Sequence, residues 1–384
     1  MAGNLRSRLA RIRGGNEPVK APGRTVATRR RASDSEFPPG WTTVGEGLRL
    51  KETIASGLGV RSDERVRLAA FSARMEDRSA AAGGMLFFDL ETTGLSGGAG
   101  TVAFLAAVGS VLSDGSFRVR QYFIDDYPSE PRLIESLEAE FQSAEAVVTY
   151  NGSSFDMPLY SVRRSMNGFG PMPQVAHVDA LHASRRLWRR VLGDCSLGSV
   201  EAAALGVRRS GDIPGREIPE CWFEYLRRGE CGRLGAVFSH NELDVRSLAA
   251  LTFMIHGAAA GRGGIMPCDL VGLADLQSRL DEGLAEGTLR RALDSGDARA
   301  ARPLMRLYRK QGRFEERIAL VGDLPDDAAG LFSKSVYAER VTGDIVEALR
   351  LAVAARDAAR GSLLDRAERR AIRLRRRLGE AEGR

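Results

Sequence analysis

The chain of 384 residues has few cysteines and few lysines, and it has no long apolar run. Its cysteines, at positions 195, 221, 231 and 268, form no C-x-x-C pair, which argues against structural zinc and against a disulfide framework. No apolar stretch approaches the roughly 20 residues of a membrane-spanning helix. The arginine-rich start of the chain is not followed by the apolar segment of a secretory signal. We therefore expect a cytoplasmic protein that has no membrane partner.

The basic charge of the chain comes almost entirely from arginine. The formal net charge is +6, and lysine occurs only at positions 20, 51, 310 and 334. Excess positive charge is compatible with binding to nucleic acid. A chain rich in arginine, alanine and glycine is, however, also typical of a GC-rich genome, and many of these arginines would simply solvate helix faces. Net charge alone is therefore weak evidence for a nucleic-acid partner.

Composition and hydrophobic periodicity divide the chain into five parts. We expect a disordered basic segment, an N-terminal extension without a motif, a domain with a sheet, a glycine-rich linker and a smaller all-α domain. These parts are residues 1–40, 41–84, 85–256, 257–264 and 265–384.

The central part alternates between strand and helix patterns. An Asp-Gly pair at 114–115 separates two apolar stretches and predicts a hairpin. Three antiparallel strands followed by helix–strand alternation predict an α/β fold, in which helices flank a mixed five-stranded sheet. The predicted strands are residues 85–91, 101–112, 117–124, 146–150 and 175–179.

The C-terminal part has a weak internal repeat. Gly312 and Gly343 each follow an apolar helical pattern and are 31 residues apart, close to the 34-residue tetratricopeptide period. A helical-repeat domain and an ordinary helical bundle both remain open. Residues 365–377 form a basic helix that would either contact phosphates or be a solvated face.

The most informative motif is LFFDLETTG, residues 86–94. Alternate side chains of a strand share one face, so Asp89 and Glu91 would point the same way at the end of a buried strand. Two such carboxylates must be hydrated, paired or bound to metal, because burying them without compensation is very costly. Metal binding and a solvated strand end are equally good readings of this motif when it is taken alone.

Two further motifs carry acidic residues near helix starts. Asp156 follows a buried strand and an Asn-Gly turn and precedes a helix that we expect to start near Pro158, so capping that helix is its simplest role. His240 and Asp244 would lie one turn apart on a helix whose N-cap is Ser239. A neutral histidine there can take a proton from a water that a metal acidifies, although a surface contact explains a lone pair equally well.

Taken together and in this order, the three motifs resemble those of the DEDD exonucleases of the RNase H-like superfamily. The resemblance is closest to the bacterial YprB-like family, which carries tetratricopeptide-like helices after its nuclease domain. It covers about residues 85–255 and includes the landmarks 177–182, 196–201 and 212–215, which look structural rather than chemical.

The resemblance implies a set of roles for the motif residues. Asp89, Glu91, Asp156 and Asp244 would bind two Mg²⁺ or Mn²⁺ ions, and His240 would be the general base. The spacing of His240 departs from the pattern of the superfamily. Members with a histidine at this position usually have four residues between it and the last aspartate, whereas members with a tyrosine have three. Here three residues separate His240 from Asp244. The nearby Asp179 is better explained by a structural hydrogen bond.

Three functions remain open at this point. The first is a Mg²⁺- or Mn²⁺-dependent nuclease for single-stranded or frayed nucleic acid, a 3′–5′ exonuclease by analogy with the superfamily. The second is a catalytically weak nucleic-acid-binding module whose C-terminal helices recruit a protein partner. The third is a scaffold in which the acids are structural. Nothing in the sequence decides between RNA and DNA.

Overall fold

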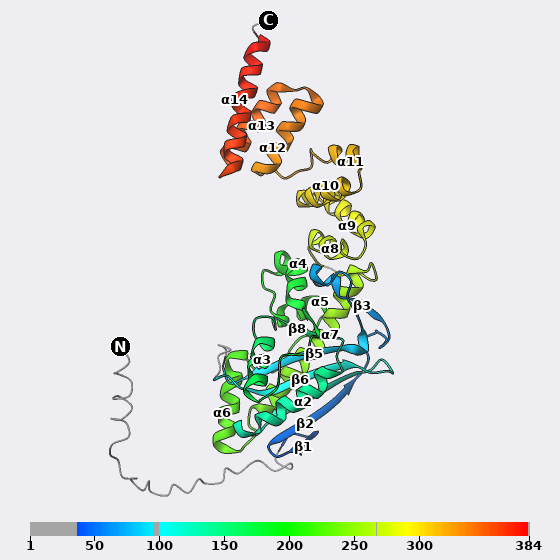
Figure 1. Ribbon diagram of the computed structural model, residues 1–384, viewed down its shortest axis with the longest axis vertical. Helices are drawn as coiled ribbons and strands as arrows, with labels where there is room; N and C mark the ends of the chain where they lie inside the picture. Colours follow the sequence, from blue (N-terminus) through cyan, green and yellow to red (C-terminus); the bar gives the residue numbers. More distant parts are fainter. Residues whose placement is uncertain (1–36, 95–99, 266, 383–384) are drawn as a thin grey trace, which may run out of the picture.

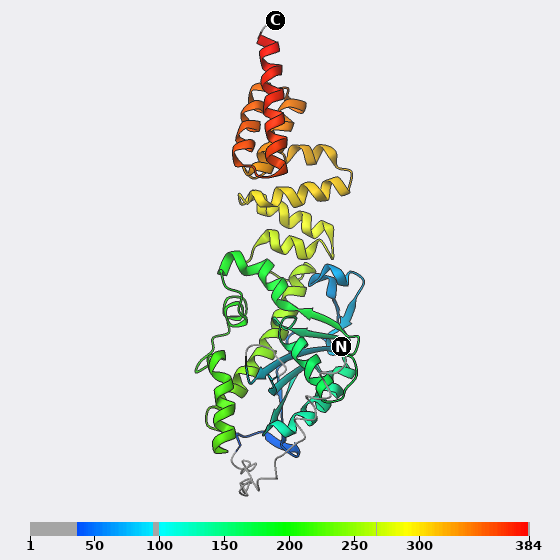
Figure 2. The same cartoon turned by 60° about the vertical axis from the view of Figure 1, so that its left-hand side comes forward.

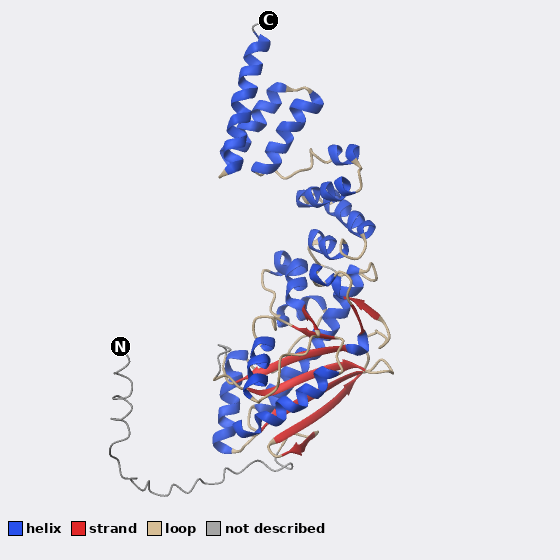
Figure 3. Ribbon diagram, viewed as in Figure 1, coloured by secondary structure: helices blue, strands red, loops and turns tan. Residues whose placement is uncertain are grey.

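The computed structural model describes residues 37–94, 100–265 and 267–382. All strands lie in one half of an elongated molecule, and the other half is helical (Figure 3). Helices at the C-terminal end stack away from the sheet, with the C-terminus at the far tip (Figures 1 and 2). The predicted disordered segment 1–40 lies almost wholly outside the described residues.

The main sheet has seven strands in the order β1-β2-β7-β6-β5-β8-β9. Strands β1, β2, β7, β6 and β5 pair antiparallel, and β8 and β9 extend the sheet in parallel from β5. A separate two-stranded sheet joins β3 to β4. The strands are β1 (Trp41–Gly45), β2 (Leu48–Ala55), β3 (Arg65–Arg67), β4 (Ser79–Ala81), β5 (Met85–Thr92), β6 (Ala103–Val111), β7 (Phe117–Ile124), β8 (Ala146–Thr149) and β9 (Ala176–Asp179).

The mixed α/β architecture predicted from the sequence is confirmed, but the predicted number of five strands is wrong. All five predicted strands exist, and the two additional ones, β1 and β2, come from the stretch 41–84 that we expected to be an extension. Strand β2 escaped prediction because it mixes charged and apolar residues and pairs with a strand about 70 positions later, Leu48 opposite Ile124. Its buried Arg49 donates to Asp125 at 2.9 Å, which compensates a charge inside the domain.

The hairpin between β6 and β7 forms where the Asp-Gly pair predicts it. Gly115 has a φ of +82°, which favours glycine, and the side chain of Asp114 accepts a hydrogen bond from the Ser116 backbone at 2.9 Å.

Helices cover both faces of the main sheet. Apolar residues of α2, α3 and α6 pack with Leu86, Phe88 and Leu90 of β5. Residues of α4 and α7 pack with Met85 and Phe87, which point to the opposite face. The helices are α2 (Glu130–Gln142), α3 (Asp156–Met166), α4 (Ala180–Leu192), α5 (Leu197–Ala204), α6 (Ile218–Arg228) and α7 (Leu234–Ala259). The short 3-10 helices are η2 (Leu68–Ala70), η3 (Ala73–Met75), η4 (Ala82–Gly84), η5 (Tyr127–Ser129), η6 (Gly215–Glu217) and η7 (Ala298–Ala300).

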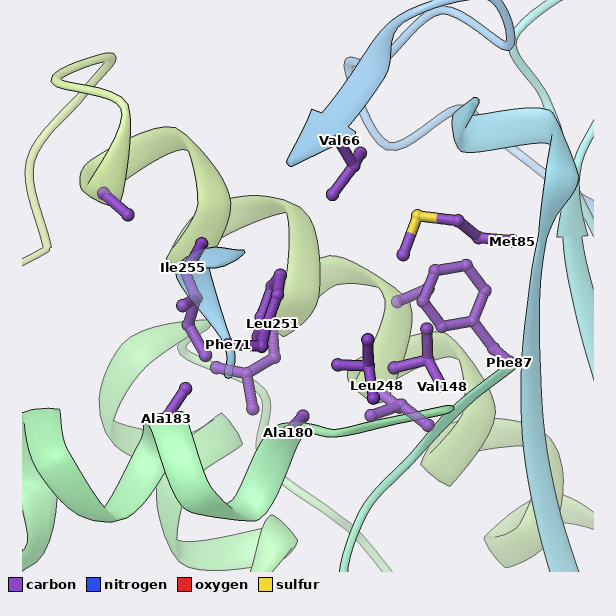
Figure 4. Close-up of a cluster of buried hydrophobic side chains, with 14 of the residues drawn as sticks. Val66, Phe71, Met85, Phe87, Val148, Ala180, Ala183, Leu248, Leu251 and Ile255 are labelled. Carbon is purple, nitrogen blue, oxygen red and sulfur yellow. The ribbon is translucent and has the colours of Figure 1, made fainter. Parts of the chain in front are cut away.

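Helix α7 is anchored tightly to the sheet. Figure 4 shows Leu248, Leu251 and Ile255 of α7 packed towards Met85, Phe87 and Val148. Each fully buried aliphatic side chain of this kind contributes about 2 kcal/mol. Gly109 of β6 allows the close approach, because a Cβ there would lie 2.5 Å from Val245 of α7. The register of α7 on the sheet is therefore well determined.

Two predicted helix boundaries and one linker boundary differ from the structure. Helix α7 begins at Leu234, so Ser239 lies within the helix, where its hydroxyl donates to the Gly235 carbonyl, and it is not an N-cap. Helix α3 begins at Asp156, two residues before Pro158. Helix α7 also continues to Ala259, so it includes the first residues of the expected glycine-rich linker 257–264.

Beyond α7 the described chain is helical, as predicted. Gly312 and Gly343 both adopt a φ of +74°, where their segments turn. The tetratricopeptide assignment and the position of the domain boundary remain predictions. None of the helices within the described residues is both long and apolar enough to cross a membrane. The helices are α8 (Leu270–Gln277), α9 (Glu282–Asp294), α10 (Ala301–Lys310), α11 (Phe314–Ala319), α12 (Ala328–Tyr337), the π-helix η8 (Ala338–Thr342), α13 (Ile345–Ala358) and α14 (Ser362–Glu382).

Candidate active site

Asp89 and Glu91 lie near the end of β5, on the face that α7 covers. Alternation along the strand places Leu86, Phe88 and Leu90 in the opposite core, so the two acids point towards α7. The Asn241 side chain of α7 donates to Asp89 Oδ2 at 2.7 Å. Both carboxylates are thus held between the sheet and the helix, as the D-x-E spacing predicts.

Asp156 approaches the same strand from the start of α3. It is the first residue of the helix, where the helix dipole favours a negative charge, and Phe155 occupies the N-cap position. Its side chain is buried. Burial raises the pKa of Asp156 to about 7, although hydrogen bonds from the backbone N–H groups of Asp156 and Leu90 lower it. The bond from Leu90 places the Asp156 carboxylate beside the strand segment that carries Asp89 and Glu91.

Asp244 on α7 joins these acids. Burial raises the pKa of Asp244, while the charges of His240 and Arg209 lower it. Burial, followed by the charges of Asp244 and Asp156, raises the pKa of Asp89 well above its usual range. Burial and the charges of Asp89 and Asp244 do the same for the pKa of Glu91. Four acids from three separate segments are therefore close enough to disfavour each other's ionisation.

His240 faces the acids with one ring nitrogen and Asp212 with the other. Its Nδ1 lies 2.7 Å from Asp212 Oδ1, and its Nε2 lies 3.5 Å from Asp244 Oδ2 and 4.0 Å from Glu91 Oε1. Arg209 Nη1 also lies 3.2 Å from Nδ1, but the contact with Asp212 is the shorter one. Because a carboxylate only accepts hydrogen bonds, we assign the hydrogen of the neutral ring to Nδ1, which leaves the lone pair of Nε2 directed towards the acids. This arrangement makes His240 a competent proton acceptor.

Asp212 belongs to the stretch 212–215, which the sequence predicts to be a structural landmark, and it lies against His240. Burial raises the pKa of Asp212, but hydrogen bonds and favourable electrostatic interactions with His240 and Arg209 together outweigh burial, and the net shift is downward. Asp212 therefore stays ionised and holds the imidazole ring in place.

Arg209 is the cation of the site and was not anticipated from the sequence. Its guanidinium pairs with Asp244 and with Glu201, whose side chain is 1% exposed. It also lies 3.2 Å from Asp212 Oδ2. In a chain in which arginine is so frequent, no local pattern distinguishes this residue from the arginines on helix faces.

Asn241 is another residue of the candidate site that the sequence did not indicate. It is fully buried, accepts from the Gln121 amide at 3.1 Å and donates to Asp89. Its position next to His240 on the helix gives no signal by itself, because the buried face of α7 becomes known only once the helix is packed on the sheet.

Asp179 has the structural role that was predicted for it. Its carboxylate accepts hydrogen bonds from the backbone of Asn151 at 2.8 Å and of Ser153 at 3.1 Å. Asn151 adopts a φ of +65°, as the Asn-Gly turn requires. These bonds fix the junction that delivers Asp156 to the site.

The four acids have the oxygen ligands that a divalent cation prefers, but their side chains are not arranged as a coordination sphere. Buried carboxylates that raise each other's pKa are relieved by a hard cation with oxygen ligands. Over the described part of the chain, however, no three His, Cys, Asp or Glu side chains stand together in a metal-holding arrangement. Arg209 and Asn241 bind Asp244 and Asp89, respectively, and so engage two of the four acids.

Comparison with known proteins agrees with this architecture. A family model described as the RNase_H superfamily matches residues 86–255. The "Uncharacterized protein YprB" of Bacillus subtilis (strain 168) is 38% identical over 169 residues, which are 44% of this chain and 40% of that protein. The match thus spans less than half of that relative.

Among solved structures, the family B DNA polymerase from the hyperthermophilic archaeon Pyrobaculum calidifontis is similar over 59% of this chain and 29% of its own, with 18% identity and a TM-score of 0.39. The family resemblance inferred from the motifs is confirmed by the family model and by the Bacillus relative. Residues 86–255 therefore have an RNase H-like fold and are similar in sequence to the RNase H superfamily.

Proposed function

We propose that this protein is a metal-dependent nuclease that hydrolyses phosphodiester bonds of single-stranded or frayed nucleic acid as a 3′–5′ exonuclease. The observation that carries the proposal is the cluster of four acids in an RNase H-like domain. Asp89, Glu91, Asp156 and Asp244 all have raised pKa values, and burial together with nearby carboxylates is among the causes for each. Such a costly arrangement is typical of a functional site.

The four acids would hold two Mg²⁺ or Mn²⁺ ions. These ions would supply charge neutralisation at the phosphodiester and a water of lowered pKa. The acids themselves come from rigid positions, a central strand and the starts or interiors of packed helices, which favours precise placement.

His240 would accept the proton of the attacking water. Its Nε2 faces Asp244 and Glu91, and its Nδ1 is fixed by Asp212. Asp212 acts through His240, so it is a positioning residue. It keeps the proton-free nitrogen turned towards the acids, and this holds whichever spacing class of the superfamily His240 belongs to.

Arg209 contacts Oδ1 of Asp244 and would compete with an ion for that oxygen and for the charge of the carboxylate, while Oδ2 has no hydrogen bond to Arg209. This contact is also the observation that favours the second candidate, a catalytically weak nucleic-acid-binding module. In that case Arg209 would keep Asp244 neutralised permanently, and the protein would hold nucleic acid without cleaving it.

The direct test is a cleavage assay with purified protein, Mn²⁺ and RNA or DNA labelled at the 5′ or the 3′ end, in single- and double-stranded form. We expect metal-dependent shortening from the 3′ end of single strands. The variants Asp89→Asn and Asp244→Asn should lose this activity by at least about a hundredfold.

The matched control is Glu242→Gln on the same helix. Glu242 pairs with Lys51 at 2.9 Å, outside the acid cluster, so its loss should leave cleavage unchanged. Binding of single strands without cleavage in any divalent metal would favour the second candidate. Equal activity of wild type and Asp89→Asn would refute the proposed site.

A further inference from the structure

A hollow lined by arginines lies among the C-terminal helices, outside the RNase H-like domain. It has a volume of about 250 Å³ and is bordered by α10, α11 and α12, which follow α9 along the molecule (Figure 1). Met305 and Leu324 provide apolar surface. We name it the arginine groove after the four residues that line it, Arg302, Arg306, Arg309 and Arg317.

Three of these arginines have no acidic partner within the described residues: Arg306, Arg309 and Arg317. Arg302 is the exception, since it pairs with Asp327 at 2.8 Å. The neighbouring cations outside the groove are also paired. Arg313, for example, binds both Glu286 and Glu316. No acidic residue is among the described residues that line the groove, so its lining retains net positive charge.

The placement of these cations costs stability. Arg302, Arg306 and Arg309 follow each other at intervals of four and three residues on α10, so they share one face of the helix. Like charges at this spacing repel each other and destabilise a helix. Arg317 adds a further positive charge from α11. An anion seated in the groove would remove this repulsion.

A separate hollow of about 590 Å³ shares Arg302 and Arg306 with the groove, so these two side chains stand between the two spaces. The lining of this second hollow also includes Asp275 and Glu282, so the arginine groove is the more positive of the two. At 1.5 Å per residue, the row from Arg302 to Arg309 extends about 10 Å along the helix axis. One strand of a nucleic acid carries about three phosphates over that length in helical form. The shape therefore fits an extended chain of anions better than a single ion.

The basic C-terminal helix α14 is a weaker candidate for such contacts. Its Arg370, Arg373 and Arg377 all pair with Glu339. One carboxylate offsets only one of these charges, but it engages all three guanidinium groups within the protein, whereas Arg306, Arg309 and Arg317 of the arginine groove have no such partner among the described residues.

We propose that the arginine groove binds the sugar–phosphate backbone of the nucleic acid on which the RNase H-like domain acts. The choice of nucleic acid as the polyanion rests on the proposed function. Guanidinium groups pair with phosphate oxygens through two parallel hydrogen bonds, which a free arginine fork favours. The groove holds backbone and reads no bases, so it serves RNA or DNA of any sequence.

Binding is measured with the full chain in EDTA, by the fluorescence anisotropy of a labelled oligothymidylate over a series of salt concentrations. Each phosphate contact to a single strand contributes about 0.7 to the slope of log affinity against log salt. The variant Arg306→Gln/Arg309→Gln/Arg317→Gln should therefore lower the slope by about 2 and weaken binding at least about tenfold at low salt.

The matched control neutralises three other exposed arginines, Arg340, Arg360 and Arg369, which likewise have no ion pair within the described residues. It should bind like the wild type. If both triple variants weaken binding equally, the affinity reflects net charge and the proposal is wrong. Unchanged binding of the groove variant, or a preference of the groove for a labelled polyglutamate peptide, also overturns it.

The same experiment separates this proposal from the proposed function. The Asp89→Asn variant leaves the groove intact, so it should bind the oligothymidylate as tightly as the wild type even though it does not cleave. A protein that binds through the groove but never cleaves would support the groove and refute the nuclease. A protein that cleaves, yet is insensitive to the groove variant in both binding and salt slope, would do the reverse.

Discussion

Replacing Arg209 with methionine tests how the acid cluster is held together. Arg209 pairs with Asp244 and with Glu201, and the Glu201 side chain is 1% exposed. The substitution keeps the apolar part of the side chain and removes the charge. Glu201 is then left buried without a cation, and Asp244 keeps the charge of His240 but loses that of Arg209, which also lowers its pKa.

The cost follows from the burial of Glu201. Removing one partner of a buried ion pair destabilises a protein by about 3–5 kcal/mol. In a domain of this size each kcal/mol lowers the melting temperature by about 2–4 °C, so we expect a decrease of about 6–20 °C. The measurement is thermal unfolding in EDTA at neutral pH, followed by circular dichroism. A decrease of less than about 2 °C would show that Glu201 does not depend on Arg209.

The double variant Arg209→Met/Glu201→Leu separates the two roles of this arginine. Replacing a whole buried ion pair with apolar residues is often nearly neutral, so most of the lost stability should return. Asp244 is then free of the guanidinium. If Arg209 competes with a cation at Asp244, the double variant should bind Mn²⁺ more tightly than the wild type. At saturating Mn²⁺, a tenfold lower Kd stabilises the folded protein further, by about 1.4 kcal/mol. Equal stabilisation of wild type and double variant by Mn²⁺ would refute the competition.

Three further predictions concern the site and its support. In EDTA the melting temperature should fall progressively between about pH 4 and pH 7. Burial raises the pKa of Asp156 to about 7, so the folded state binds a proton more tightly than the unfolded state and loses this advantage as pH rises through that range. Mn²⁺ should reduce the decrease, and a melting temperature that rises with pH in this range would contradict the reasoning. Asp212→Asn should lower kcat about tenfold or more and leave KM nearly unchanged, because Asp212 holds His240 and does not bind substrate. A variant in which only KM changes would contradict this positioning role. Gly109→Ala should lower the free energy of unfolding, measured by chemical denaturation, by about 1–3 kcal/mol, because the added Cβ would overlap with Val245. If the variant is as stable as the wild type, α7 can shift on the sheet.

The sequence allowed much of the central fold to be predicted because its strands are short apolar runs bounded by turn residues. The Asp-Gly hairpin and the strand that carries Asp89 both follow from local patterns. Strand β2 could not be predicted in the same way. Its side chains are half polar, and its place in the sheet depends on pairing with β7, far along the chain.

The residues of the candidate site also differ in whether local sequence patterns predict them. Asp89, Glu91, Asp156, His240 and Asp244 stand in motifs with characteristic spacing, and the structure brings the acids together around His240. Their roles in catalysis and metal binding remain predictions.

Arg209, Asp212 and Asn241 enter the site only through tertiary packing. Arg209 and Asp212 belong to a segment between α5 and α6, and its contact with α7 has no local signature. Asn241 lies on the face of α7 that contacts β5 and β7, and only the packing of the helix reveals that face.

The account depends most on whether the four carboxylates bind divalent ions, and Mn²⁺ binding followed by electron paramagnetic resonance measures this directly. We predict two bound ions per wild-type chain, with binding abolished or reduced to one weak ion in Asp89→Asn, and retained in Glu242→Gln. A wild-type protein that binds no Mn²⁺, or an Asp89→Asn variant that binds it as the wild type does, would contradict the account.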